Sequence, residues 1–163
     1  MKTKIALVVA AAALILAGVA GASKQSRVSV GVTQSKLGRI LVDGRGHTLY
    51  LFGKDKRSKS SCNGTCASYW PPLIASGKPR AMSGARASLL GRTKRQDGRW
   101  QVTYNRHPLY TFALDTKKGQ TKGEGLDDFG GEWDAVSPAG VKVEKSAATS
   151  SSGGYGGYGG YTP

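Results

Sequence analysis

Two cysteines and two histidines are the residues of this chain whose types could support metal or redox chemistry. Cys62 and Cys66 are four residues apart, and His47 and His107 are the only histidines among the 163 residues. Two thiolates and two imidazoles form a ligand set that suits Cu(I) or Zn(II). A copper or zinc site, or a redox site, built from these four residues is therefore one hypothesis for the function.

A disulfide between the two cysteines is the competing interpretation, and the sequence favours it. The Cys-x-x-x-Cys spacing is not that of a zinc knuckle, and the chain has only one such pair. Thiols are usually oxidised outside the cytoplasm, and the start of the chain has the pattern of an export signal. We therefore predict a local disulfide between Cys62 and Cys66, no metal ligands and no bound cofactor.

The remaining polar residues do not form a recognisable catalytic site. The sequence has no Gly-x-Ser-x-Gly nucleophile elbow, and acids at two hairpin ends do not by themselves make a glycosidase. An acidic stretch could ligate calcium, but its spacing fits no EF-hand loop, and a solvated loop that pairs with the basic middle segment is favoured. Its members are Glu124, Asp127, Asp128, Glu132 and Asp134. Catalysis is unsupported, and we predict a noncatalytic protein.

The two ends of the chain have compositions that do not suit a folded core. Two lysines precede an apolar run of signal-peptide length, and small residues at Ala20 and Ala22 offer a cleavage site. We predict a signal peptide over residues 1–22, with an uncleaved anchor as the alternative because the run approaches the roughly 17 residues of a short membrane helix. Residues 23–35 are predicted to be a linker, and the Ser/Gly/Tyr-rich residues 146–163 a disordered tail.

An internal repeat is the strongest pattern between these ends. With a shift of 60, residues 47–52 (HTLYLF) lie over residues 107–112 (HPLYTF), and Asp55 lies over Asp115. Such coincidence at a fixed offset indicates two copies of one supersecondary unit. Each copy is too small to bury its own apolar face, so the two copies should pack against each other.

The repeat predicts the architecture of residues 36–145, in which the copies span about residues 38–73 and 98–141. Each copy contains a hairpin whose turn has Gly or Asn, the residues that adopt positive φ most readily. We predict a single small domain, mainly β, of two pseudo-equivalent β-hairpin repeats with one or two short helices, the second at Ala85–Leu90. The predicted shared core consists of Leu49, Tyr50, Phe52, Trp70, Trp100, Val102, Leu109, Tyr110, Phe112 and Trp133.

Two strand positions carry more specific expectations. Residues 49–52 are apolar on both faces, which predicts a central strand covered on both sides. Within residues 100–104, apolar and polar residues alternate, which predicts a strand with one solvated face. Asp55 and Asp115 follow their strands directly. There a carboxylate can accept backbone N–H hydrogen bonds from the next turn, which is a structural role.

The motif Tyr-x-(Phe/Trp/Tyr)-x-x-Asp occurs in both copies, at residues 50–55 and 110–115. Together with the two cysteines and two tryptophans, it resembles the bacterial secreted-repeat family of predicted lipoproteins over about residues 37–141. The resemblance implies an extracytoplasmic, often lipidated protein whose biochemical function is not established. The chain departs from it in lacking a lipobox cysteine and in carrying Arg106 where a turn glycine is expected. The repeat-motif residues with structural roles are Tyr50, Phe52, Asp55, Tyr110, Phe112, Asp115, Trp70 and Trp133.

Charge supplies the remaining clue to function. The net charge is +14, and the segment from Lys54 to Arg106 is especially basic. A basic protein outside the cell meets anionic wall polymers or lipid headgroups before nucleic acid, so no nucleic-acid partner is predicted. The hypothesis is an exported binding or structural protein, extracellular, wall-associated or periplasmic, that contacts anionic envelope polymers or lipid headgroups. The alternatives are the metal or redox protein above and a surface protein with an adhesive tyrosine tail.

Overall fold

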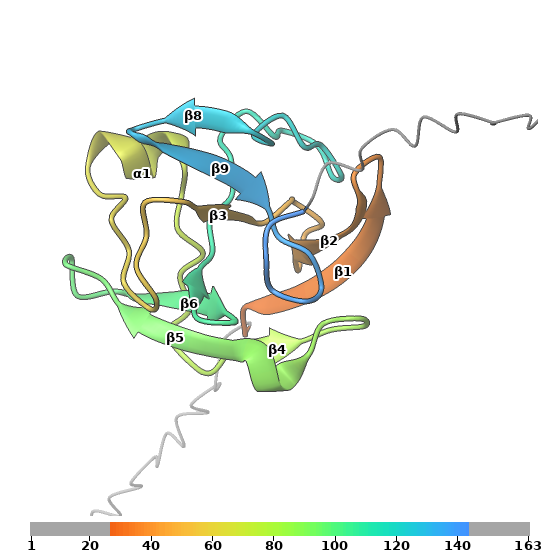
Figure 1. Ribbon diagram of the computed structural model, residues 1–163. Helices are drawn as coiled ribbons and strands as arrows, with labels where there is room; N and C mark the ends of the chain where they lie inside the picture. Colours follow the sequence, from red (N-terminus) through yellow and green to blue (C-terminus); the bar gives the residue numbers. More distant parts are fainter. Residues whose placement is uncertain (1–26, 144–163) are drawn as a thin grey trace, which may run out of the picture.

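The computed structural model describes residues 27–143, and three small sheets with two short helices make up this part of the chain (Figure 1). The predicted signal peptide and tail lie outside the described residues. The mainly β fold with one or two short helices is confirmed. The first sheet has the strand order β2 (Gly38–Asp43), β1 (Ser29–Ser35) and β4 (Arg80–Ala81). The second has the order β3 (Tyr50–Phe52), β9 (Gly131–Ala135) and β8 (Leu126–Asp128). The third has the order β5 (Leu90–Lys94), β6 (Trp100–Tyr104) and β7 (His107–Pro108).

The first sheet corrects the predicted linker. Residues 29–35 form β1, which pairs antiparallel with β2 from Val30 opposite Asp43 to Ser35 opposite Gly38. Strand β1 also pairs in parallel with the two-residue β4. Glycine and polar residues dilute the apolar pattern of β1, and its second partner, β4, begins only at Arg80. Local sequence patterns therefore carry little trace of this sheet.

Strand β3 lies at the centre of the molecule, as the sequence predicts. All three of its residues are buried, and β3 pairs antiparallel with β9, with Tyr50 opposite Ala135 and Phe52 opposite Trp133. The equivalent strand of the second copy is irregular. Strand β7 ends at Pro108, and Tyr110 forms only single bridges, to Tyr50 and to Pro72. Because proline has no backbone N–H, Pro72 and Pro108 interrupt a regular ladder there.

The third sheet corrects two further predictions. Within the predicted second helix, only the 3₁₀ helix η1 (Ala87–Leu89) forms, and Leu90 begins β5 and lies opposite Tyr104. The predicted solvated face of β6 is absent because its polar residues Gln101 and Thr103 are buried. The helix α1 (Thr65–Tyr69) forms after the first cysteine and is capped at its C-terminus by Trp70.

Two hydrophobic clusters form the core, and they contain all the predicted core residues except Trp100. An aromatic cluster centres on the tryptophans and includes both cysteines, and an aliphatic cluster lies beside it. Trp100 is 41% exposed, and the guanidinium of Arg92 lies 4.9 Å from its ring centre. Trp100 begins β6 opposite Lys94, beside the loop that connects β5 to β6, and its side chain there remains partly open to solvent.

Candidate functional site

The two copies of the repeat motif exchange hydrogen bonds at the centre of the molecule. The Tyr50 hydroxyl donates to Oδ2 of Asp115 at 2.6 Å, and the Tyr110 hydroxyl donates to Oδ2 of Asp55 at 2.7 Å. The backbones of the two tyrosines also exchange N–H···O bonds of 2.8 and 3.0 Å. Each Tyr–Asp pair is thus completed by the other copy, which gives the molecule a pseudo-twofold relation.

Four stacked rings continue this relation across the core. Their order is Phe52, Trp133, Trp70 and Phe112, with successive ring centres 4.1, 3.9 and 4.3 Å apart. The two tyrosine rings meet the tryptophans edge-on, at 5.4 Å for Tyr50 and 5.1 Å for Tyr110. Stacked and edge-on contacts of aromatic rings stabilise a core beyond the area they bury. Each copy contributes the same three ring types to one shared assembly.

The two motif aspartates also hold the turns that follow them, as expected from the sequence. Oδ1 of Asp55 accepts the Ser61 N–H at 2.6 Å, and Oδ1 of Asp115 accepts the Lys122 N–H at 2.9 Å. The hydrogen bonds to tyrosines of the opposite copy were missed by sequence reasoning. The constant spacing of Tyr and Asp within each motif was their only signal, and it does not show which copy supplies the partner.

Burial sets the protonation of these pairs. It raises the pKa of Asp55 to about 6, although hydrogen bonds from Ser61 and Tyr110 oppose the shift. Burial, assisted by the neighbouring carboxylates, also raises the pKa of both tyrosines, so the phenols keep their protons and act as donors. Tyr50 is fully buried and Asp115 is 5% exposed. The Tyr50–Asp115 pair is therefore a largely buried link between the two copies.

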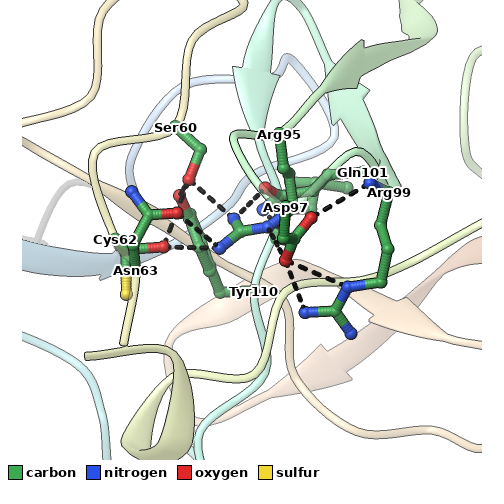
Figure 2. A network of polar contacts seen from close by, with 9 residues as sticks. Ser60, Cys62, Asn63, Arg95, Asp97, Arg99, Gln101 and Tyr110 are labelled. Carbon is green, nitrogen blue, oxygen red and sulfur yellow. Dashed lines mark hydrogen bonds and ion pairs between the residues drawn. The ribbon is translucent and has the colours of Figure 1, made fainter. Parts of the chain in front are cut away.

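A buried arginine connects this centre to the cysteine loop (Figure 2). The Arg95 side chain is 1% exposed. It donates to the hydroxyl of Ser60, the side-chain oxygen of Gln101 and the carbonyl of Cys62, each at 2.7 Å, and to Oδ1 of Asn63 at 3.1 Å. The sequence does not single out Arg95, because nothing local distinguishes it from the neighbouring surface cations.

The arginine network reaches the repeat motif through Ser60. The Tyr110 hydroxyl lies 2.8 Å from Oγ of Ser60, which also accepts from Arg95. On the outer side, Asp97 lies 3.5 Å from Nε of Arg95 and 2.7 Å from Arg99. Hydrogen bonds from Arg99 lower the pKa of Asp97 to about 2. A buried cation needs such complete pairing, so the network fixes the loop geometry around Arg95.

The structure separates the four residues of the metal hypothesis. Cys62 and Cys66 form a disulfide with their Cα atoms 5.3 Å apart, so neither sulfur is a thiolate. Nδ1 of His47 lies 3.4 Å from Oδ2 of Asp43 in the first hairpin. Burial, and then the charge of Arg57, lowers the pKa of His107. Across residues 27–143, no three or more His, Cys, Asp or Glu side chains are placed to share a metal ion.

The acidic stretch does not converge on one point either. Oε2 of Glu124 accepts the backbone N–H of Ala135 at 2.8 Å, and Glu132 pairs with Lys142 at 3.5 Å. Asp127 and Asp128 lie exposed on β8, and Asp134 is buried. These acids therefore spread over the β8–β9 hairpin and its surroundings.

A loop of exposed cations follows the first motif. We define the first basic platform as Lys56, Arg57, Lys59 and Arg106, all of which are exposed. The Ser58 N–H donates to the carbonyl of Arg106 at 2.7 Å, and the Ser58 carbonyl accepts from the Thr93 hydroxyl. These bonds hold the loop against the turn of the second hairpin. None of the four side chains forms an ion pair with another residue in the 27–143 range.

These features define a class of protein: a small β domain made by duplication, with a cross-repeat Tyr–Asp core and a disulfide-bonded loop. Two segments, residues 31–74 and 91–137, match the family model described as a secreted repeat of unknown function. The chain belongs to this family, and the protein is exported. No curated protein and no solved structure matches the chain. Within the described residues, no helix is long and apolar enough to cross a membrane.

Proposed function

We propose that this exported protein is a noncatalytic binding module of the cell envelope that holds an anionic polymer on its first basic platform. The observation that carries the proposal is the set of four exposed cations gathered around one loop without an acidic partner within residues 27–143. A charged polymer chain with phosphate or carboxylate groups along its length would meet several of these cations at once. Such multiple contacts favour polymers over single small anions.

The loop is held in place before any ligand arrives. Both backbone polar groups of Ser58 are bonded, and the Lys59 N–H donates to the Lys56 carbonyl at 2.9 Å. A loop whose backbone is already ordered loses less conformational entropy on binding than a mobile one. The flanking Asp55 forms no ion pair with a platform cation, and its carboxylate instead accepts hydrogen bonds from Ser61 and Tyr110.

Binding to beads that carry long poly(glycerol phosphate) or alginate chains tests the proposal. Each Lys or Arg close to an anionic surface contributes about 1 kcal/mol, so K56Q/R57Q/K59Q should weaken binding at least about tenfold. The control K36Q/K78Q/R86Q removes the same charge from exposed positions outside the platform and should bind nearly as wild type. The two polymers distinguish phosphate from carboxylate as the recognised group.

Salt dependence is the second readout. Wild-type binding should fall steeply between low and high ionic strength, because exposed charges are screened over about 10 Å at 0.1 M salt. Absent or salt-insensitive binding, or equal losses in the platform variant and the control, would exclude the platform as the binding site. Stronger binding to vesicles of anionic phospholipid than to either polymer would identify a membrane surface as the partner instead.

A further inference from the structure

The loop that follows the second motif has the same construction as the first basic platform. The Gly119 N–H donates to the carbonyl of Gly46 at 3.1 Å. In the first loop, the Ser58 N–H donates in the same way to the carbonyl of Arg106. The Gln120 N–H donates to the Lys117 carbonyl at 3.3 Å, and the Lys59 N–H of the first loop donates to the Lys56 carbonyl at 2.9 Å. Each loop thus leaves its own motif aspartate and rests on the hairpin turn of the opposite copy.

The second loop also carries the same set of charges. We define the second basic platform as Arg45, Lys117, Lys118 and Lys122, which are all exposed. The second basic platform has three lysines from the loop and one arginine from a hairpin turn. The first basic platform likewise has three cations from its loop and one arginine, Arg106, from a hairpin turn. None of its side chains forms an ion pair with another residue of the described part of the chain.

Packing of the core does not explain this match. The loops differ in sequence, KRSKS against TKKGQTK, and the second has one residue more between the motif aspartate and the residue bonded to the hairpin turn. All eight cationic side chains point into solvent rather than into the shared aromatic assembly. The duplicated feature at the surface is therefore a cluster of positive charge on the loop after each motif, in which Gln120 takes the place of Lys59 and Lys122 that of Ser61.

We infer that the domain is bivalent: the two basic platforms each bind one anionic polymer chain, so that one molecule bridges two chains. The inference rests on the proposed function and extends it from holding a polymer to crosslinking it. The first platform lies against the β5–β6–β7 sheet, and the second lies at the turn between β2 and β3. In Figure 1, β2 lies to the right of β3 and β9, and the β5–β6 pair lies below them. A chain bound at one platform leaves the other open.

The stoichiometry of binding tests bivalency directly. Titration calorimetry of the exported full-length protein with a short glycerol phosphate oligomer should give two oligomers per protein molecule. K56Q/R57Q/K59Q and K117Q/K118Q/K122Q should each give one, and the control K36Q/K78Q/R86Q should give two. Circular dichroism of each variant verifies that the fold is unchanged. One oligomer bound by the wild type would overturn bivalency and leave the proposed function standing.

Light scattering from mixtures with long poly(glycerol phosphate) tests the bridging itself. Wild type and control should form large complexes, which disperse at excess protein because each chain becomes saturated. Each variant that lacks the cations of one platform should still bind the polymer, but its mixtures should scatter at least tenfold less light than those of the wild type. Undiminished scattering by either variant would overturn the inference. If the wild type binds neither the polymer nor the oligomer, the proposed function itself is wrong. If the protein clusters only anionic vesicles, the ligand is a lipid surface and the inference of polymer crosslinking is wrong.

Discussion

The hydrogen bond between Tyr50 and Asp115 joins two side chains that are almost fully removed from water. A buried carboxylate costs free energy unless its oxygens accept hydrogen bonds. Asp115 has two donors, the Tyr50 hydroxyl and the Lys122 N–H. The phenol therefore offsets part of the cost of burying Asp115, and Tyr110 does the same for Asp55.

Replacing Tyr50 tests this role. Tyr50→Phe keeps the ring but removes one of the donors to the Asp115 carboxylate. We expect the free energy of unfolding to fall by about 1–3 kcal/mol, the usual cost of leaving a buried polar group without a partner. Tyr69→Phe is the matched control, because Tyr69 is 52% exposed and should change stability by less than about 0.5 kcal/mol. Equal urea midpoints for the two variants would show that the bond contributes no net stability.

The half-buried Asp55 should make stability depend on pH in a definite direction. Burial raises its pKa to about 6 in the folded state, above roughly 3.9 in the unfolded chain. Folding therefore favours the protonated acid, so this contribution is fully present below about pH 4 and is lost as the pH rises through 6. Asp55→Asn removes the titration. We expect the stability of the variant relative to wild type to increase between pH 4 and 7.

Urea denaturation of both proteins across this pH range measures the effect of Asp55. Comparing the two proteins at each pH removes the contributions of other groups, such as His107, whose lowered pKa gives the opposite slope. A stability difference that stays constant from pH 4 to 7 would mean that Asp55 titrates near its ordinary pKa.

At the scale of elements, the two hairpins differ in how their turns reach positive φ. In the first copy, Gly46 has a φ of 89°. In the second, Asn105 and Arg106 have φ values of 47° and 66°, which form a two-residue turn without glycine. Asparagine tolerates this conformation, whereas a side chain such as that of arginine is strained there. The missing turn glycine noted in the sequence thus corresponds to a strained residue.

Substituting glycine for Arg106 should relieve this strain. Arg106→Gly is expected to raise the free energy of unfolding by about 1 kcal/mol, because glycine adopts positive φ without a steric penalty. Arg106→Ala serves as the control, since it removes the same charge but keeps the Cβ atom. Thermal unfolding compares the two. If alanine stabilises the protein as much as glycine does, charge repulsion within the first basic platform, rather than backbone strain, is the cause.

The elements that the sequence predicts correctly are those whose information is local. The covered strand at residues 50–52 and the cysteine loop follow from an apolar run and from spacing. The predicted first hairpin is correct only at its turn, because β2 and β3 belong to different sheets and a single bridge, Val42 to Thr48, joins the two segments. Strand β1 escapes prediction because glycine and polar residues dilute its apolar pattern, although its partner β2 follows directly in the chain. The buried Arg95 escapes prediction because partners such as the Cys62 carbonyl come from a distant part of the chain. The predicted burial of Trp100 is wrong, because its hydrophobicity predicts a core position, whereas its place beside the connecting loop of a hairpin leaves the side chain partly exposed.

At the scale of the molecule, the most central contacts join the two copies. The tyrosine backbones bond across the pseudo-twofold relation, the Tyr–Asp pairs cross it, and the ring stack draws two rings from each copy. Further backbone bonds cross as well, from Leu73 to Leu109 and from Val136 to Leu49. The core therefore exists only when both copies are present, which is the expected behaviour of repeats that cannot bury an apolar face alone.

Separating the copies tests this dependence. Fragments 27–84 and 85–143 divide the chain at the exposed segment after β4, so that each retains its own hairpin. Each fragment alone should lack the near-ultraviolet circular dichroism of packed tryptophans and should show no cooperative urea transition. Mixing them should restore both signals, because the stack and the Tyr–Asp pairs can form between the fragments. Cooperative unfolding of either fragment alone would show instead that one copy has a sufficient core, and that duplication serves the surface more than the fold.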